Sequence, residues 1–439
     1  MPDSRPASLA LLGGEPAVRI PSPHFRWPLI GAEEEEAVLN QLRSGQLSIP
    51  RRCGVIEEFE ANFAAFHGLP YSLSTGSGTA ALHAAYFGLG LEPGDEVLAP
   101  AYTHLGTVLP MLQLGLIPVL CDVEEETGNL DPSEIENRLS PRTRALAITH
   151  QYGHISDMEA IIAAAKRHNL SILEDCSHAH GATDYGKLAG TFGDVACFSL
   201  QAHKVISAGE GGILVTKDPR IFERAALLGH FRERRSTTTD ADLPFVETGY
   251  GLKNRFHPLA AALAVVQLRK LPETIEKRRR NMQYFEAALE ETPGVRPLPT
   301  RPGVSRGGYF RFLVRYNPDE LYGLPIEQYI RAVRAEGVLE ISPGSLAKPL
   351  HLTRIFQTLT DGMYSSGWPR KGPHVSRELV YRPGDFPRAE RFSALTIQFP
   401  AFTEPSVPII DAYCSAMKKV ASHVLEILDA CFPTTLWPR

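Results

Sequence analysis

The chain has 439 residues, of which 43% are hydrophobic and 22% are charged, as is ordinary for a soluble globular protein with a sizeable core. Its length favours two domains, or one large domain with a smaller lobe. The formal net charge of −5 gives no electrostatic argument for nucleic-acid or membrane binding.

The six cysteines are scattered and contain no CxxC pair: Cys53, Cys121, Cys176, Cys197, Cys414 and Cys431. This spacing indicates reduced thiols rather than a disulfide framework or a zinc site. The amino terminus lacks a basic segment followed by a signal-type apolar run, and no apolar span of about 20 residues occurs. We therefore expect a cytoplasmic protein without a metal site.

The first half of the chain alternates helices with apolar strands. Residues 1–30 are Pro-rich and predict an irregular arm. Acids early and an arginine late predict an exposed helix over 33–43, as the macrodipole favours. Apolar spacing predicts further helices and strands. The helices are expected over 56–67 and 157–168, and the strands over 97–100, 118–122, 145–149 and 170–174. This alternation predicts an α/β fold with a mostly parallel sheet.

Residues 72–83 predict a strand end, a turn of small residues and the start of a helix, with Gly78 and Thr79 at the turn. A helix start offers free N–H groups and a positive dipole end, which suit a phosphate. Taken alone, this turn is better explained by a plain Ser/Thr helix cap.

The most informative residues are Asp175 and Lys204. Asp175 follows an apolar strand, and Lys204 lies on a polar turn between a strand that ends at Ser199 and a return that contains Gly211 and Gly212. Either residue alone is ordinary, because Lys204 could be a surface lysine and Asp175 a helix cap. Together they suit a pyridoxal phosphate site, where a lysine forms a Schiff base and an acid holds the pyridine nitrogen protonated.

The second half of the chain changes in pattern. Residues 258–290 predict a long helix whose first turns are Ala-rich and buried, leading to a second lobe. Residues 309–316 alternate like a strand, and 326–336 and 411–429 predict helices. Residues 344–375 are rich in Gly, Ser and Pro and predict an irregular loop. We expect three parts: an arm at 1–30, a large domain at 31–280 and a small α+β domain at 281–439.

In this order, the segments resemble those of the fold-type I pyridoxal phosphate enzymes, and more narrowly the DegT/StrS family of sugar and aminocyclitol aminotransferases. The likeness runs from about residue 29 to the last helix. Its strongest phrases are residues 174–181, residues 193–199 with Lys204 and 210–212, and residues 94–97 with Pro100.

The resemblance implies roles for four residues around the cofactor ring. Lys204 matches the lysine that bonds to the cofactor, and Asp175 matches the acid at the pyridine nitrogen. His178 falls where the family carries Gln or His beside the phenolic oxygen. His104 falls where an aromatic residue stacks on the ring. His178 could instead cap a helix, and His104 could be a core histidine.

The resemblance also implies a phosphate site. Gly78 and Thr79 match its turn, and Ser199 matches a hydroxyl that contacts the phosphate. Asn254 matches a residue that reaches the phosphate of the neighbouring subunit, which implies a homodimer with shared active sites. Ser199 as a strand-end hydroxyl and Asn254 as a turn residue are the alternatives.

The family suggests a transaminase with L-glutamine or L-glutamate as donor and a ketone on a cyclitol, such as scyllo-inosose, or on a ketosugar as acceptor, in antibiotic or sugar biosynthesis. We expect acceptor contacts from 344–375 and from the basic cluster at Arg232, Arg234 and Arg235. Free keto-cyclitols, nucleotide-linked ketosugars and sugar phosphates all stay open as acceptors, and the arginines favour one that bears a phosphate. The alternatives are a sugar dehydratase or lyase on the same fold, and a regulator without catalysis. Some relatives carry His in place of the lysine, but the spacing from Ser199 favours Lys204 over His203.

Overall fold

The computed structural model describes residues 8–230, 249–344, 348–359 and 366–430. The predicted basic cluster at Arg232, Arg234 and Arg235 lies outside these ranges, as do Cys431 and parts of 1–30 and 344–375. The five described cysteines are free thiols, and only Cys53 among them is exposed. Within the same ranges, no helix is both long enough and apolar enough to cross a bilayer.

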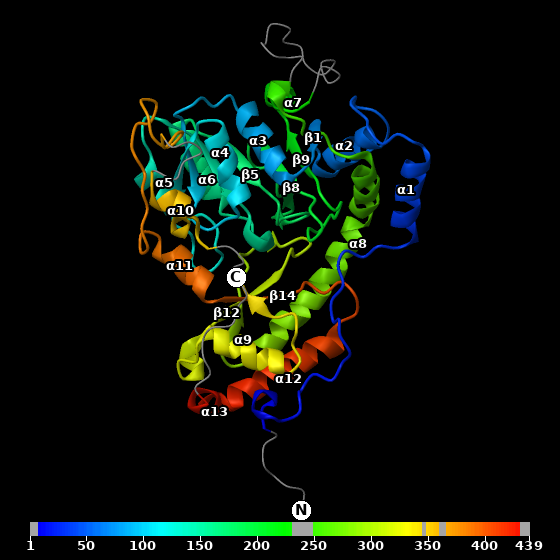
Figure 1. Cartoon of the computed structure of the whole chain (residues 1–439), viewed down its shortest axis with the longest axis vertical. Helices are drawn as coiled ribbons and strands as arrows, with labels where there is room; N and C mark the ends of the chain where they lie inside the picture. Colours follow the sequence, from blue (N-terminus) through cyan, green and yellow to red (C-terminus); the bar gives the residue numbers. More distant parts are fainter. Residues whose placement is uncertain (1–7, 231–248, 345–347, 360–365, 431–439) are drawn as a thin grey trace, which may run out of the picture.

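A seven-stranded sheet forms the centre of the larger part of the molecule (Figure 1). Its strands, in spatial order, are β1 (Tyr71–Thr75), β9 (Gly212–Thr216), β8 (Val195–Ser199), β5 (Ser171–Asp175), β4 (Thr143–Thr149), β2 (Glu96–Pro100) and β3 (Ile117–Cys121). Strands β8, β5, β4, β2 and β3 pair in parallel, whereas β9 is antiparallel to both its neighbours. The expected α/β class with a mostly parallel sheet is confirmed.

Both faces of this sheet are buried, because alternate residues of each strand enter different cores. In β4, Leu146 and Ile148 belong to one hydrophobic cluster, and Ala145 and Ala147 belong to the other. The helices that contribute to the first cluster are α2 (Gly54–His67), α5 (Ser133–Arg138), α6 (Met158–His168) and the start of α8 (Pro258–Leu289). Those that contribute to the second are α3 (Gly78–Gly88), α4 (Leu105–Gln113) and α7 (Pro219–Leu227).

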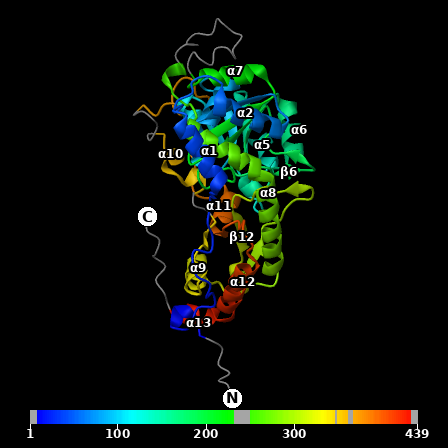
Figure 2. The same ribbon diagram turned by 90° about the vertical axis from the view of Figure 1, so that its right-hand side faces the viewer.

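Helix α8 is 32 residues long and joins the two parts of the molecule (Figures 1 and 2). Its first half packs on α2 and on α1 (Ala32–Arg43), and its later turns pack on β10 (Val295–Pro297) and α12 (Val407–Ser422) of the smaller part. The predicted boundary at residue 280 falls inside this continuous helix, so the division into 31–280 and 281–439 stays a prediction.

The smaller part is built on a four-stranded sheet that is antiparallel throughout. Its strands, in spatial order, are β10 (Val295–Pro297), β12 (Phe312–Tyr316), β14 (Thr396–Phe399) and β13 (Ser342–Pro343). Helices α9 (Ile326–Ala335), α12 (Val407–Ser422) and α13 (Val424–Asp429) close its core. Leu9 and Val18, from the expected amino-terminal arm, are buried in the same core.

Several boundaries differ from those the sequence predicts. The strand expected over 309–316 begins only at Phe312, because Tyr309 has a positive φ of 46° that breaks the extended chain. The helix expected over 411–429 begins at Val407 and is interrupted at His423. There, the imidazole lies 2.8 Å from the carbonyl oxygen of Lys419, a local side-chain contact that competes with helical bonding.

Some short elements are additional to the predictions. The described part of 344–375 contains a 3-10 turn, Leu350–Leu352, and α10 (Arg354–Gln357), so it is not wholly irregular. Another 3-10 turn, Ala10–Leu12, lies in the amino-terminal arm. A three-stranded sheet joins β11 (Val304–Ser305), β6 (Thr183–Asp184) and β7 (Lys187–Leu188), and α11 (Pro387–Ala394) precedes β14.

Candidate active site

A cavity of about 230 Å³ lies at the carboxyl ends of the parallel strands. Ligands of open α/β sheets bind at this edge. Seven of the eight residues predicted for the site line the cavity: Gly78, Thr79, His104, Asp175, His178, Ser199 and Lys204. Asn254 does not line it. The fold therefore brings together residues that lie far apart in the sequence.

Lys204 is held by the loop that follows β8. The loop is a tight return, because Leu200 N–H donates to the Gly211 carbonyl and Lys204 N–H donates to that of Gln201. Lys204 also accepts at its own carbonyl a hydrogen bond from the indole N–H of Trp27, at 3.0 Å. Hydrogen bonds to both the N–H and the carbonyl of Lys204 thus fix the position from which its side chain enters the cavity.

The Trp27 contact connects this loop to the smaller part of the molecule. The guanidinium of Arg278 lies over the Trp27 ring, 3.9 Å from its centroid. Arg278 is buried in α8 and donates hydrogen bonds to the Thr403 hydroxyl and the Gly308 carbonyl, each at 2.9 Å. Sequence reasoning missed both residues, since neither lies in a recognisable motif.

The amino group of Lys204 lies over the Phe310 ring, 3.9 Å from its centroid. Burial lowers the pKa of Lys204 to about 7, the Asp175 carboxylate opposes this shift, and the Arg311 guanidinium adds to it. A lysine with such a pKa is divided between amine and ammonium near neutrality, so it can both accept and return a proton.

Asp175 lies at the floor of the cavity at the end of β5 and is 3% exposed. One carboxylate oxygen accepts a hydrogen bond from the Thr107 hydroxyl at 2.7 Å, and the other accepts from the Ser177 N–H at 3.1 Å. These two bonds fix the orientation of the carboxylate. The carboxylate thus lies fixed on the wall of the cavity, and its predicted contact with a protonated ring nitrogen stays a prediction.

A chain of hydroxyl groups supports Asp175. Thr107 lies 2.8 Å from the Thr103 hydroxyl, which in turn lies 2.9 Å from the Thr149 hydroxyl. The three threonines are buried and come from three different segments. The sequence places Thr103 after a strand, at the ligand-binding edge of the sheet, but it does not single out Thr107, or Thr149 at the end of a predicted strand.

Glu174, next to Asp175, faces away from the cavity. It accepts hydrogen bonds from the backbone N–H groups of Gly190, Phe192 and Gly193 and lies 2.9 Å from the His150 imidazole. His150, Glu174 and Cys176 are close enough to hold a metal ion. Both Glu174 oxygens nevertheless already accept hydrogen bonds from the loop that precedes β8. These bonds indicate that Glu174 has a structural role.

His178 stacks on Phe310, with ring centroids 4.3 Å apart and planes at 13°. Burial lowers the pKa of His178 well below its usual value, and the nearby Lys204 charge adds to the shift. His178 lines the cavity, and its Nδ1 atom is buried and has no hydrogen-bond partner among the residues that the structure describes. A buried polar atom without a partner needs a ligand or water to satisfy it.

His104 is the N-cap of α4 and lies exposed at the mouth of the cavity. Its Nδ1 accepts a hydrogen bond from the Gly106 N–H at 3.0 Å. The core-histidine alternative is therefore wrong for this residue. Its predicted stacking on a bound ring stays a prediction.

The amino end of α3 forms the opposite wall. Gly78 and Thr79 precede the first intrahelical hydrogen bonds, so their N–H groups are available to an anion. A Cβ atom at Gly78 would lie 2.8 Å from the Ser199 Cβ, and one at Gly212 would collide with the Ser77 carbonyl. Glycine at these two positions lets the helix start, Ser199 and β9 approach closely enough to form a cradle.

Asn254 lies beside this cradle rather than inside it. Its carbonyl accepts a hydrogen bond from the Gly76 N–H at 2.8 Å, and its own N–H donates to the Gly229 carbonyl. Its side chain is partly exposed. A contact of this side chain with a neighbouring subunit stays a prediction.

A second compartment of about 220 Å³ adjoins the first. The two share five lining residues: Thr103, His104, His178, Gln201 and Lys204. The remaining wall consists of Tyr102, Gln151, Tyr152, His203, Phe310, Arg311, Gly344 and Gln398. Of the described residues of the expected 344–375 segment, only Gly344 contributes here. Most residues of this wall lie outside the motifs from which the sequence predicts the site.

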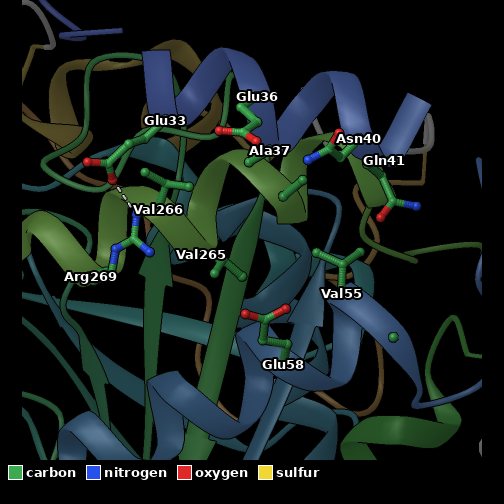
Figure 3. Close-up of a pocket in the computed structure, with 12 residues that line it drawn as sticks. Glu33, Glu36, Ala37, Asn40, Gln41, Val55, Glu58, Val265, Val266 and Arg269 are labelled. Atoms are coloured by element: carbon green, nitrogen blue, oxygen red, sulfur yellow. Dashed lines mark hydrogen bonds and ion pairs between the residues drawn. The ribbon is translucent and has the colours of Figure 1, made fainter. Parts of the chain in front are cut away.

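A larger cleft of about 910 Å³ lies between α1, α2 and α8 (Figure 3). Glu33, Glu36, Glu58 and Arg269 line it, and all four are exposed. Exposed charges are well solvated and gain little reactivity from their surroundings. Lys204 is not on its wall, so the smaller, enclosed cavity is the candidate active site.

The comparisons with known proteins agree with this geometry. A model of the DegT/DnrJ/EryC1/StrS aminotransferase family matches residues 28–364. The chain belongs to this family. It is 34% identical over 373 residues to the L-glutamine:2-deoxy-scyllo-inosose aminotransferase of Streptoalloteichus tenebrarius, a match that covers 82% of this chain and 86% of the relative.

Two solved structures have the same fold. One is DesI in the presence of its TDP-sugar product, which is 26% identical, with a TM-score of 0.78 and coverage of 96% and 98% of the two chains. The other, from Streptococcus pneumoniae, is a pyridoxal phosphate form that is 22% identical, with a TM-score of 0.76 and coverage of 92% and 99%. The protein is thus an aminotransferase that depends on pyridoxal 5′-phosphate, as the sequence predicts.

The residues of the cavity fit this cofactor. The unpartnered Nδ1 of His178 is available to a phenolic oxygen, and the free N–H groups at the start of α3 are available to a phosphate. Asp175 and Lys204 line the same cavity, where one ring can reach both. The glycines at 78 and 212 let the helix start, Ser199 and β9 approach one another closely at the end of the cavity where these N–H groups lie.

We expect the rate of cofactor uptake by the cofactor-free chain to rise with pH through a midpoint near 7. Only the neutral amine of Lys204 attacks an aldehyde, and burial lowers its pKa to about 7. Stopped-flow absorbance across the neutral range measures this midpoint. A rate that continues to climb toward the ordinary lysine value of about 10.4 would contradict the prediction.

Proposed function

We propose that this enzyme transfers the amino group of L-glutamine to a ketone of the 2-deoxy-scyllo-inosose type, in aminocyclitol antibiotic biosynthesis. The observation that carries the choice of acceptor is a set of neutral polar side chains on the wall of the second compartment, beside the cations Lys204 and Arg311. Gln151, Gln398 and Tyr102 line it, and amide and hydroxyl groups suit the hydroxyls of a polyol ring. The name of the Streptoalloteichus tenebrarius relative supports the same donor and acceptor.

We propose that Lys204 is both the covalent anchor and the proton carrier. When bound, the cofactor supplies an aldehyde that takes up and releases the amino group and a ring that accepts electrons. Lys204 Nζ then removes the α-proton of the donor and returns it, which its pKa of about 7 permits. The Asp175 carboxylate fixes the ring nitrogen, and His178 fixes the ring's orientation from the Phe310 side.

We propose that the phosphate is held by Gly78, Thr79 and Ser199, with His104 at the mouth covering the ring.

The enzyme is proposed to act as a homodimer in which Asn254 completes the neighbouring subunit's phosphate site. The partly exposed Asn254 side chain, beside the helix start, supports this arrangement.

We propose a cytoplasmic location for the enzyme. The free buried thiols support it, because free thiols suit a reducing compartment.

Absorbance of the purified holoenzyme tests the function. L-Glutamine is expected to convert the spectrum to that of the amine form, and 2-deoxy-scyllo-inosose is expected to reverse it, because each half-reaction proceeds alone in a ping-pong mechanism. Parallel initial-rate lines against both substrates are the expected kinetics. Converging lines would contradict the mechanism.

A nucleotide-linked ketosugar is the second candidate acceptor, because the DesI structure was solved with its TDP-sugar product. Reversal by a TDP-ketosugar, but not by the cyclitol, would select this class. A spectrum that does not change with any amino donor would favour the lyase, dehydratase or regulator alternatives. Product analysis would separate a lyase or dehydratase, which forms a product, from a regulator, which forms none.

A further inference from the structure

Arg311 is a cation on the wall of the second compartment. It immediately precedes β12, and its side chain lines the compartment together with Lys204 and His178. Its guanidinium lies over the Phe310 ring, 5.3 Å from the centroid. Within the described ranges, Arg311 has no ion-pair or hydrogen-bond partner, unlike Arg315 in β12, which pairs with Glu125.

An unpaired guanidinium in such a place is costly, because burial removes part of its hydration without an opposite charge in return. Burial lowers the pKa of Arg311, and Tyr152 opposes this shift. Charged groups kept in a pocket without a protein partner are typically matched by a charge on the ligand. The compartment therefore fits a ligand with one anionic group.

The position of Arg311 suits one end of an amino acid. Two cations lie close to the Phe310 ring. The Lys204 amino group is 3.9 Å from the ring centroid, and the Arg311 guanidinium is 5.3 Å from it. The amino group of the donor must come to the Lys204 end of this ring. The α-carboxylate carbon is two bonds from that amino nitrogen, and the Arg311 guanidinium beside the same ring is the cation available to it.

The two substrates differ in charge at this point. L-Glutamine brings an α-carboxylate, whereas a keto-cyclitol is neutral and uses amide and hydroxyl groups such as those of Gln151 and Gln398. Both must occupy the same compartment in turn. An arginine that pairs with only one of them affects one half-reaction and leaves the other nearly unchanged.

We propose that Arg311 binds the α-carboxylate of the amino donor and so selects the donor in a compartment that the neutral acceptor also uses. This inference rests on the proposed transaminase function and adds the residue that recognises the donor. The guanidinium presents a planar fork that matches a carboxylate with two parallel hydrogen bonds.

The test separates the two half-reactions in the Arg311→Gln holoenzyme. The rate constant kcat/KM for the absorbance change with L-glutamine is expected to fall on the order of 10²-fold, the usual effect of removing one partner of a buried charge pair. The reverse half-reaction, driven by the amine that corresponds to 2-deoxy-scyllo-inosose, is expected to change by less than about threefold, because that amine has no carboxylate.

Two further variants act as controls. Arg311→Lys keeps the charge but loses the fork, so we expect an intermediate loss with L-glutamine only. Arg315→Gln removes an arginine of β12 outside the compartment and is expected to change neither half-reaction. Equal losses in both half-reactions of Arg311→Gln, or a loss with the cyclitol amine alone, would overturn the proposal.

Glutarate tests carboxylate binding without any reaction, because it has no amino group to transfer. The test therefore does not depend on the identity of the acceptor. The dissociation constant of glutarate for the holoenzyme, measured by calorimetry, is expected to rise at least about tenfold in Arg311→Gln. Equal binding to both proteins, or no binding to the wild type, overturns the proposal. A wild-type spectrum that changes with L-glutamine but not with the cyclitol amine would count against the proposed acceptor alone.

Discussion

Replacement of Lys204 by alanine is expected to lower the transamination rate at least about 10⁴-fold, because the variant loses both the covalent anchor and the proton carrier. The amino group of Lys204 is the group over Phe310 whose pKa burial brings to about 7. Product formation from L-glutamine measures the effect, and the absorbance of added cofactor shows whether it still binds without the covalent bond.

The matched control for this variant is Lys217→Ala. Lys217 directly follows β9 and is exposed, so its removal changes the charge of the protein equally without touching the cavity. We expect it to retain wild-type activity and cofactor absorbance. If Lys204→Ala kept a substantial part of its activity, another residue, with His203 the nearest candidate, would have to carry the proton.

Replacement of Asp175 by asparagine is expected to slow the half-reaction with L-glutamine on the order of 10²- to 10³-fold. An amide has nearly the same shape but no negative charge to hold a proton on the ring nitrogen. The Ser177 N–H can still donate to the amide oxygen, and the Thr107 hydroxyl can rotate to accept from the amide nitrogen. The fold and the cofactor site are therefore expected to persist.

Rapid-mixing absorbance gives the rate of this half-reaction. Asp184→Asn, in β6 and outside the cavity, is the control with the same chemical change. A rate in Asp175→Asn close to that of the control would mean that the charge at the floor of the cavity does not assist the reaction.

The sequence predicts the strands and the residues at their ends well, because the information is local. An apolar run followed by Asp175 or Ser199 shows where a strand stops, and parallel strands end at one edge of the sheet. The same reasoning predicts the helix start at Gly78. These residues lie together in the structure as a consequence of the sheet's topology.

The remaining wall depends on packing between distant segments. Trp27, Phe310 and Arg311 reach the lysine loop from the arm and from the smaller part of the molecule, and no local pattern marks such contacts. Thr107 lies inside an apolar helix, where a threonine is unremarkable until Asp175 is seen beside it. The break at His423 also escaped prediction, since it depends on one side chain's bond to the backbone.

The contact between Trp27 and the Lys204 carbonyl has a thermodynamic consequence. Trp27 supports Arg278, and Arg278 is bonded to Thr403 and Gly308, so the lysine loop, the arm and the smaller part share one set of buried contacts. Elements coupled in this way unfold together. A ligand that binds only the native state raises the free energy of unfolding. Cofactor loading at Lys204 therefore raises the melting temperature of both parts of the molecule in a single transition.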